Sequence, residues 1–195
     1  MCHFPRFFTS FLPDLLYLIA MQRTKWVDRK FTFDFPEGWI YNIMERLQGT
    51  PARIKELVAN LDEDHANQKP GGKWSIKEHI GHLYDLEFLH DGRLDDFIEG
   101  KEILRAADMK NVLTEESNHN LSSLEQLQEK FNHSRRDFLT KLASLDDATL
   151  MRKALHPRLQ ILMRPVDVAY FCAEHDDHHL ASIRAIVEGR PSMDE

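Results

Sequence analysis

Apolar residues recur at intervals of three and four over long stretches of this chain, which is the spacing of helices with one buried face. The clearest stretch runs from Ile76 to about Ile98. It is preceded by Ser75, which together with Glu78 has the spacing of a capping box, in which each side chain bonds the other residue's backbone N–H. We therefore expect a long helix to begin here and to end before Gly100.

Similar patterns predict further helices. The expected segments are residues 40–47, 50–61, 122–145 and 165–188. A second capping box, at Ser122 and Glu125, opens the third of these, and Pro165 suits the first position of the last. Residues 155–164 are expected to form an irregular loop. Four main helices predict an all-α domain, a four-helix bundle.

The composition agrees with one helical globular domain. The chain has 195 residues, 42% of them hydrophobic and 29% charged, which excludes disordered and fibrous classes. Only eight Gly and eight Pro are available for turns, which disfavours an all-β sandwich or barrel. The formal net charge of −7 gives no overall positive field, so nucleic acid is not expected as a partner.

The two ends of the chain are interpreted separately from its middle. Residues 1–24 are expected to be an N-terminal extension and residues 25–190 the domain. Residues 1–20 have two readings, a weak targeting segment or an upstream start that precedes a natural start at Met21. No apolar run is long enough to cross a membrane. Because two cysteines cannot build a disulfide framework, a cytoplasmic location is expected.

Histidine is unusually frequent, with eleven in the chain, and three of them fall between positions 175 and 179. On the last predicted helix His175 and His179 lie on the apolar stripe, so their side chains are expected to point inward. Imidazoles at positions i and i+4 can bind one ion, as they do in HExxH zinc helices, although the glutamate of that motif is absent here. The alternative is a pair of hydrogen-bonded core histidines. His178 is expected in an outer position or at the surface.

A third ligand should come from a facing helix. The helix after Ser75 offers four candidates: His79, His82, Glu87 and His90. Helical periodicity slightly favours His79, but it does not settle the choice. Cys172 is the only thiol near these residues, so a closed thiolate site is not expected. Three imidazoles would leave positions for water or substrate, which is the pattern of catalytic rather than structural sites.

A family resemblance enters at these residues. Residues 73–93 (KWSIKEHIGHLYDLEFLHDGR) resemble the W-S-x-x-E-x-x-x-H-L-x-D-x-E signature of the DinB/YfiT-like superfamily. Residues 173–183 (AEHDDHHLASI) resemble its closing H-x-x-x-H helix, and the likeness extends over about residues 25–188. It implies a four-helix bundle that holds a divalent ion, zinc first and nickel second, with His82, His175 and His179 as the ligands.

The same resemblance implies a small-molecule substrate and a metal-dependent activity. Relatives include thiol transferases and isomerases that use low-molecular-weight thiols, and proteins described as metal-dependent hydrolases. It also suggests a homodimer. The reaction is the property that transfers least between members, because a fold and its ligands do not determine a reaction.

Two residues are candidates for catalytic roles beside the ion. Glu87 carries a carboxylate for proton transfer, although it lies about 140° from His82 around the helix. His156 can reach the site from its loop. Asp85 and Asp176 are candidates for holding the second N–H of a ligand histidine. The alternative function is a non-catalytic, metal-stabilised bundle that acts as a binding or sensing module.

Overall fold

Helices account for most of the chain that the computed structural model describes, residues 23–190. The helices are α2 (Ile40–Gln48), α3 (Thr50–Val58), α4 (Glu63–Ala66), α5 (Ile76–Ile98), α6 (Val112–Glu116), α7 (Leu124–Ala143), α8 (Asp147–Leu150) and α9 (Pro165–Val187). Two short strands, β1 (Ala154–His156) and β2 (Ile161–Met163), and four 3-10 turns, η1 (Trp26–Asp28), η2 (Glu37–Trp39), η3 (Pro70–Gly72) and η4 (His119–Leu121), complete the elements. Residues 1–22 of the predicted extension lie outside the described residues.

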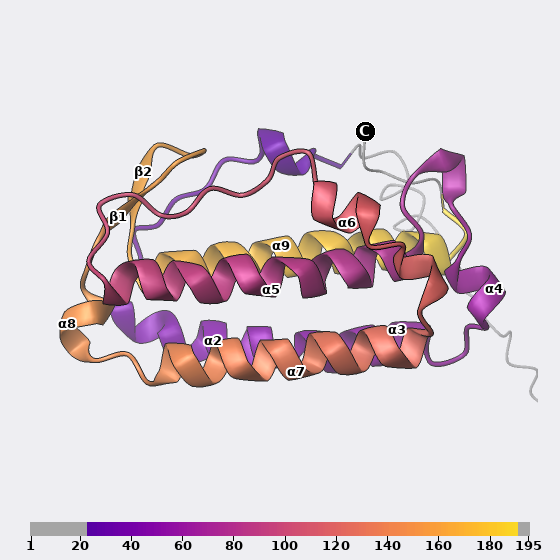
Figure 1. The fold of residues 1–195 in the computed structure, drawn as a ribbon, viewed down its shortest axis with the longest axis horizontal. Coiled ribbons are helices and arrows are strands. Elements are labelled where there is room, and N and C mark those ends of the chain that lie inside the picture. Colours follow the sequence, from indigo (N-terminus) through magenta and orange to yellow (C-terminus); the bar gives the residue numbers. More distant parts are fainter. Residues whose placement is uncertain (1–22, 191–195) are drawn as a thin grey trace, which may run out of the picture.

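Four long rods form the bundle, and α2 and α3 follow one another as the first of them (Figure 1). Helix α5 packs against α7 and α9, while α2 and α3 pack against α9 and α7. The first rod and α5 therefore stand at opposite corners, and the chain crosses the bundle diagonally between them. The structure confirms the predicted four-helix bundle. No helix within residues 23–190 is long and apolar enough to span a bilayer.

The helix starts show which local predictions were correct. At α5 the Ser75 hydroxyl accepts the Glu78 backbone N–H at 3.1 Å, and the Glu78 carboxylate accepts the Ser75 N–H at 2.8 Å, so this capping box is confirmed. At α7 the prediction was wrong by one residue. Ser122 closes turn η4 through its N–H, and the capping box is formed by Ser123 and Gln126 instead.

Three other details differ from the sequence prediction. The segment 155–164 is not irregular, because β1 and β2 pair antiparallel as a hairpin with Ala154 opposite Met163. The helix that begins at Thr50 ends at Val58 rather than near residue 61. Phe88, one of the apolar residues between Ile76 and Ile98, is 61% exposed and so does not lie on the buried face of α5. The hairpin was not predicted because strands of three residues are too short to show an alternation of apolar and polar side chains.

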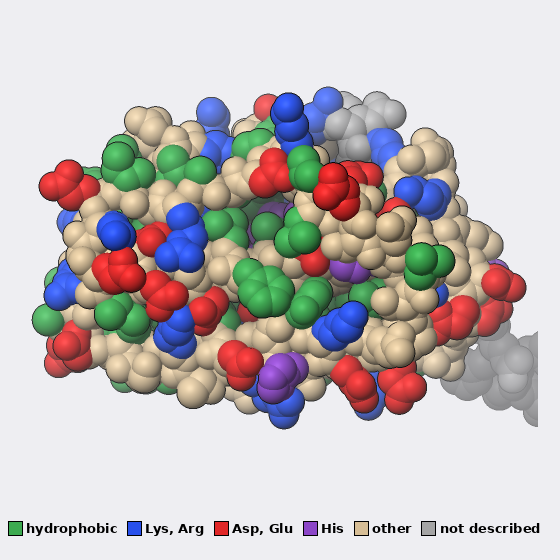
Figure 2. Space-filling view, in the orientation of Figure 1, with side chains coloured by type: hydrophobic (Ala, Val, Ile, Leu, Met, Phe, Trp, Pro, Cys, Tyr) green, Lys and Arg blue, Asp and Glu red, His purple; other side chains and the backbone are tan. Residues whose placement is uncertain are grey.

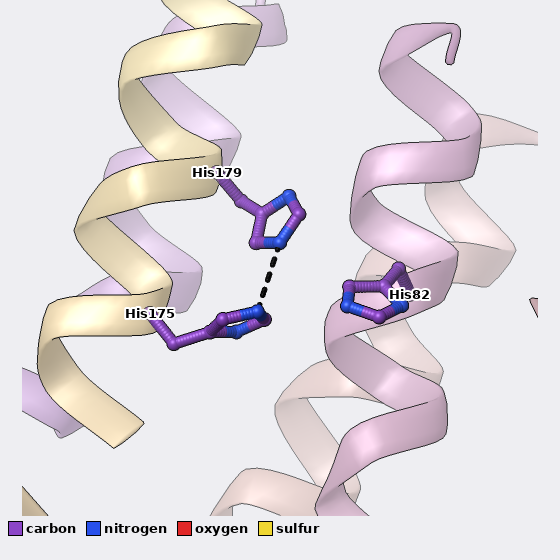
Figure 3. A group of neighbouring side chains, drawn as sticks. All are labelled: His82, His175 and His179. Atoms are coloured by element: carbon purple, nitrogen blue, oxygen red, sulfur yellow. Dashed lines mark hydrogen bonds between the residues drawn. The ribbon is translucent and has the colours of Figure 1, made fainter. Parts of the chain in front are cut away.

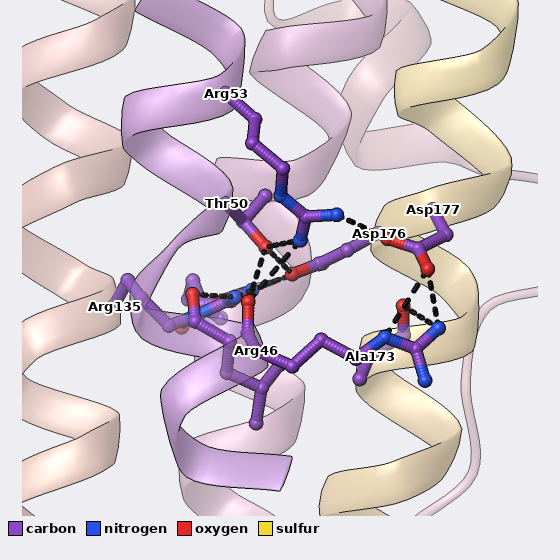
Figure 4. A network of polar contacts seen from close by, with 9 residues as sticks. Arg46, Thr50, Arg53, Arg135, Ala173, Asp176 and Asp177 are labelled. Carbon is purple, nitrogen blue, oxygen red and sulfur yellow. Dashed lines mark hydrogen bonds and ion pairs between the residues drawn. The ribbon is translucent and has the colours of Figure 1, made fainter. Parts of the chain in front are cut away.

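A buried polar group crosses the middle of the apolar core. Arg135 on α7 is 1% exposed, and its guanidinium bonds the carboxylate of Glu87 on α5. The guanidinium also bonds the carboxylate of Asp176 on α9 (Figure 4). It also donates to the Leu47 carbonyl at 3.2 Å, while the Thr50 hydroxyl donates to Asp176 at 2.7 Å. These bonds join all four rods of the bundle at one level.

Replacing Arg135 by methionine should destabilise the fold strongly. Removing the guanidinium leaves two buried carboxylates without a counter-ion, and breaking a buried pair in this way typically costs about 3–5 kcal/mol. The free energy of unfolding in urea measures the effect. Arg136→Met, at the exposed neighbouring position, is the matched control and should change stability by less than about 0.5 kcal/mol. Equal stability of the two variants would contradict this interpretation of Arg135.

Candidate metal centre

Three buried histidines from two helices face one another beneath the surface (Figure 3). His82 comes from α5, and His175 and His179 come from successive turns of α9. One ring nitrogen from each lies within 4.8 Å of the other two. The Nε2 atoms of His175 and His179 are 3.2 Å apart. Two nitrogens bound to one tetrahedral zinc ion at its usual bond length lie about 3.3 Å apart, so the α9 pair fits such an ion.

The remaining nitrogen of His82 is oriented by a chain of hydrogen bonds. Its Nδ1 lies 3.0 Å from the Thr114 hydroxyl, which donates to the Asp85 carboxylate at 2.9 Å. Because the hydroxyl proton goes to Asp85, Thr114 can only accept from His82, which places the His82 proton on Nδ1. The lone pair of Nε2 is then free for an ion. Asp85 was predicted to hold a ligand histidine, and the structure interposes Thr114 between them.

His119 supports the same carboxylate and was not given a role from the sequence. Its Nε2 lies 2.8 Å from Asp85, and both side chains are buried. The ring occupies the space beside Gly81, where an added Cβ would lie 2.2 Å from it. A glycine inside a strongly predicted helix was the available indication that another group approaches α5 at this point.

His79 holds His179 in a comparable way. The two Nδ1 atoms are 2.9 Å apart, which leaves Nε2 of His179 directed at His175. Helical periodicity had slightly favoured His79 as a ligand, whereas the three nitrogens that converge include His82. Trp74 covers the group, with its ring centroid 4.7 Å from that of His82.

Two other predicted positions lie elsewhere. Glu87 is bound to Arg135 and does not line the cavity beside the histidines, so a catalytic role for it stays a prediction. Asp176, predicted to hold a ligand histidine, instead bonds Arg135 and Thr50.

His178 is buried rather than at the surface, and its Nδ1 lies 2.6 Å from a guanidinium nitrogen of Arg23. His156 lines the same cavity as the three histidines, and a catalytic role for it stays a prediction. Burial raises the pKa of the Cys172 thiol far above its ordinary value, so this group stays protonated.

Burial also determines the protonation state of the three histidines. It lowers the pKa of His82 to about 4, and the neighbouring His79 adds to this effect. The pKa values of His175 and His179 are likewise held well below the usual range, first by burial and then by the surrounding imidazoles. All three rings are therefore neutral at pH 7, which is the form that binds metals.

The histidines lie on the wall of a cavity of about 870 Å³ that opens to the surface. Trp26 and Trp74 both line it, together with residues of α5 and α9. In Figure 2 histidine side chains are visible in a hollow rimmed by hydrophobic groups. A small molecule that enters this hollow meets the three imidazoles.

The arrangement of helices and histidines can now be compared with known proteins. Residues 46–183, which include all three histidines, match the DinB superfamily. The chain belongs to the DinB superfamily. This assignment confirms the resemblance seen in the sequence, while no curated protein matches this DinB chain.

Two solved structures share the DinB fold. YfiT from Bacillus subtilis, described as a probable metal-dependent hydrolase with an unusual four-helix bundle topology, superposes with a TM-score of 0.72 at 17% identity. That match covers 83% of this chain and 93% of YfiT. A mycothiol-dependent maleylpyruvate isomerase gives a TM-score of 0.61 at 9% identity, covering 76% of this chain and 60% of the isomerase. At these identities the likeness concerns the fold.

Acidification should destabilise the metal-free protein through these histidines. Their pKa values are lower in the folded than in the unfolded chain, so the unfolded chain binds more protons as the pH falls below 6.5. Each such histidine should then remove about 1.4 kcal/mol per pH unit until its folded pKa is reached, near 4 for His82. Urea unfolding of EDTA-treated protein between pH 7 and pH 5 measures the slope. His175→Gln should flatten it, and a slope unchanged by that substitution would contradict the assignment.

Thr114→Val should weaken metal binding without unfolding the bundle. The substitution removes the acceptor that holds the His82 Nδ1 proton, and the loss of such outer partners typically weakens metal affinity about 10–100-fold. Competition titration of zinc against a chromophoric chelator gives the affinity. Thr140→Val, at an exposed position on α7, should leave it unchanged. Equal affinities for the two variants would show that Thr114 does not orient His82.

Proposed function

We propose that this protein is a metal-dependent enzyme that binds one divalent ion through His82, His175 and His179 and acts on a small molecule. The observation that carries the proposal is the convergence of three neutral, buried imidazole nitrogens within 4.8 Å on the wall of a large open cavity. Burying several imidazoles costs stability unless each ring nitrogen has a hydrogen-bond partner or a metal ion. Nδ1 of His175 has no hydrogen-bond partner among the described residues.

The donor set supports a transition metal over a hard cation. Three imidazoles suit zinc or nickel, while magnesium and calcium prefer oxygen ligands. A bound ion with open positions would lower the pKa of a bound water or thiol toward neutrality. The chain itself supplies the rest. Thr114 and His79 orient two of the rings, and Trp74 shields them from bulk water.

Hydrolysis and thiol transfer are the two reactions proposed for this site. The description of YfiT supports the first and that of the mycothiol-dependent isomerase supports a role for a small thiol. His156, which lines the cavity, is proposed to contact the substrate. An open cavity beside the histidines favours an enzyme over a non-catalytic module stabilised by metal. A homodimer in the cytoplasm stays a prediction.

Metal analysis tests the proposal directly. Wild-type protein should carry about one equivalent of zinc or nickel after dialysis, since structural and catalytic histidine sites bind such ions tightly. His82→Ala should lose it, whereas His133→Ala, at an exposed histidine on α7, should retain it. Less than about 0.1 equivalent in wild type, unchanged by added zinc or nickel, would refute the site. Turnover assayed with and without low-molecular-weight thiols then separates the reactions, because a hydrolase needs no thiol.

A further inference from the structure

Two arginines line the cavity, and no carboxylate of residues 23–190 is bound to them. Arg93 on α5 is 2% exposed, and its Nε donates to the Arg105 carbonyl at 3.2 Å. Arg158, between β1 and β2, lies over the Phe171 ring at 5.6 Å, and its Nη2 is buried with no hydrogen-bond partner among the described residues. Neither arginine forms an ion pair with any residue in 23–190. The nearby Asp96 carboxylate is already bound by Arg105.

These two guanidinium groups repel one another. Burial lowers the pKa of Arg93; the negative charge of Asp96 partly offsets this effect, and the positive charge of Arg158 adds to it. Burial lowers the pKa of Arg158 as well. A buried cation without a counter-ion is costly, and arginine cannot escape the cost by losing its proton. An anion between the two groups would remove both the repulsion and the unmet hydrogen-bonding capacity.

Neighbouring histidines leave further nitrogens unsatisfied. Nδ1 of His156 accepts the Leu159 backbone N–H at 3.2 Å, so the proton of the neutral ring is on Nε2, which is buried without a partner. Nδ1 of His90 is also buried and unpartnered. In residues 23–190, six buried side-chain nitrogen or oxygen atoms lack a partner, and four of them belong to residues that line this one cavity. This clustering of unpartnered atoms around one cavity indicates that the cavity binds a polar ligand, because such atoms are normally rare.

Acidic groups on the cavity wall do not neutralise the arginines. Asp108 accepts the backbone N–H groups of Lys110 and Val112, at 2.9 and 2.6 Å. Glu115 accepts the indole N–H of Trp74 at 2.8 Å. Both carboxylates are therefore engaged at the rim by groups other than the two arginines.

The positions along α5 separate this end of the cavity from the three histidines. His82 and Arg93 are eleven residues apart, which is about 16 Å along a helix axis at 1.5 Å per residue. Between them Leu86 and Leu89 line the cavity with apolar surface. The cavity thus has a metal-binding end, an apolar middle and a cationic end.

We propose that Arg93 and Arg158 bind the carboxylate or phosphate of an organic anion whose apolar part extends toward His82, His175 and His179. The inference rests on the proposed function insofar as it makes this anion a substrate that reacts at the histidine end. The binding of the anion itself depends only on the cationic end. His156 donates its Nε2–H to the same anionic group and completes the set of donors.

The test uses metal-free protein, so that no ion can attract the anion. 4-Phenylbutanoate, 2-phenylethyl phosphate and the neutral 4-phenylbutanamide are titrated, with the fluorescence of Trp26 and Trp74 in the cavity wall and calorimetry as readouts. At least one anion should bind about tenfold or more tightly than the amide, since hydrogen bonds to charged groups are worth about 1.5–3 kcal/mol. The tighter of the two anions identifies the class. Equal binding of anions and amide, or no binding of any probe, would overturn the proposal.

Substitutions test whether the preference for anions over the amide comes from the arginines. Arg158→Gln should abolish the preference for the anion over the amide, and Arg158→Lys should keep part of it because the charge remains. Arg136→Gln makes the same charge change at an exposed position on α7 and should leave the preference intact. Arg158 lies in a hairpin turn, so its substitution tests the proposal even if Arg93→Gln fails to fold. An unchanged preference in Arg158→Gln would refute it.

One further variant separates this proposal from the metal site. In His82→Ala the preference for the anion should persist, because the cationic end does not include that residue. Absence of metal in the wild type together with retained anion preference would therefore refute only the metal centre. Metal binding without any anion preference would refute only the cationic end.

Discussion

The buried ion pairs of Arg135 determine how the helices that carry the histidines face one another. Asp176 directly follows His175 on α9, and Glu87 lies five residues after His82 on α5. A guanidinium on α7 binds both carboxylates and so fixes the rotation of α5 and α9 about their own axes. Because neighbouring positions on a helix point in different directions, the histidines are turned to the other side, toward the cavity. The candidate metal centre thus depends on a residue that does not touch it.

The segment between α5 and α7 completes the site from outside the bundle. It runs over α5 and brings Thr114 and His119 down onto Asp85. The approach is possible because Gly81 leaves room for the imidazole of His119. The bundle therefore provides the candidate ligands, and the crossing segment provides, through Thr114 on α6, the hydrogen bonds that set the tautomer of His82.

Helical periodicity and capping residues were sufficient to predict the bundle and the inward direction of His175 and His179. They could not choose between His79 and His82, which lie only about 60° apart around the helix, and the choice came from the family resemblance. Thr114 and His119 lie in a segment without periodicity, so nothing local marked them. Arg93 and Arg158 bind no carboxylate of the described residues, and this depends on contacts between distant parts of the chain, which a sequence pattern does not contain.

The charge of the cavity could not be predicted from the composition of the chain either. A net charge of −7 describes the chain as a whole and argues against a polyanionic partner. Inside the cavity, burial acts differently on the two kinds of base. Histidine responds to it by losing its proton, which makes the rings available to a metal, whereas arginine keeps its charge. With the proposed divalent ion at one end and two guanidinium groups at the other, the interior would be positive although the chain is acidic. A cavity of this kind selects small anions over neutral molecules of the same shape, because only an anion satisfies the buried donors.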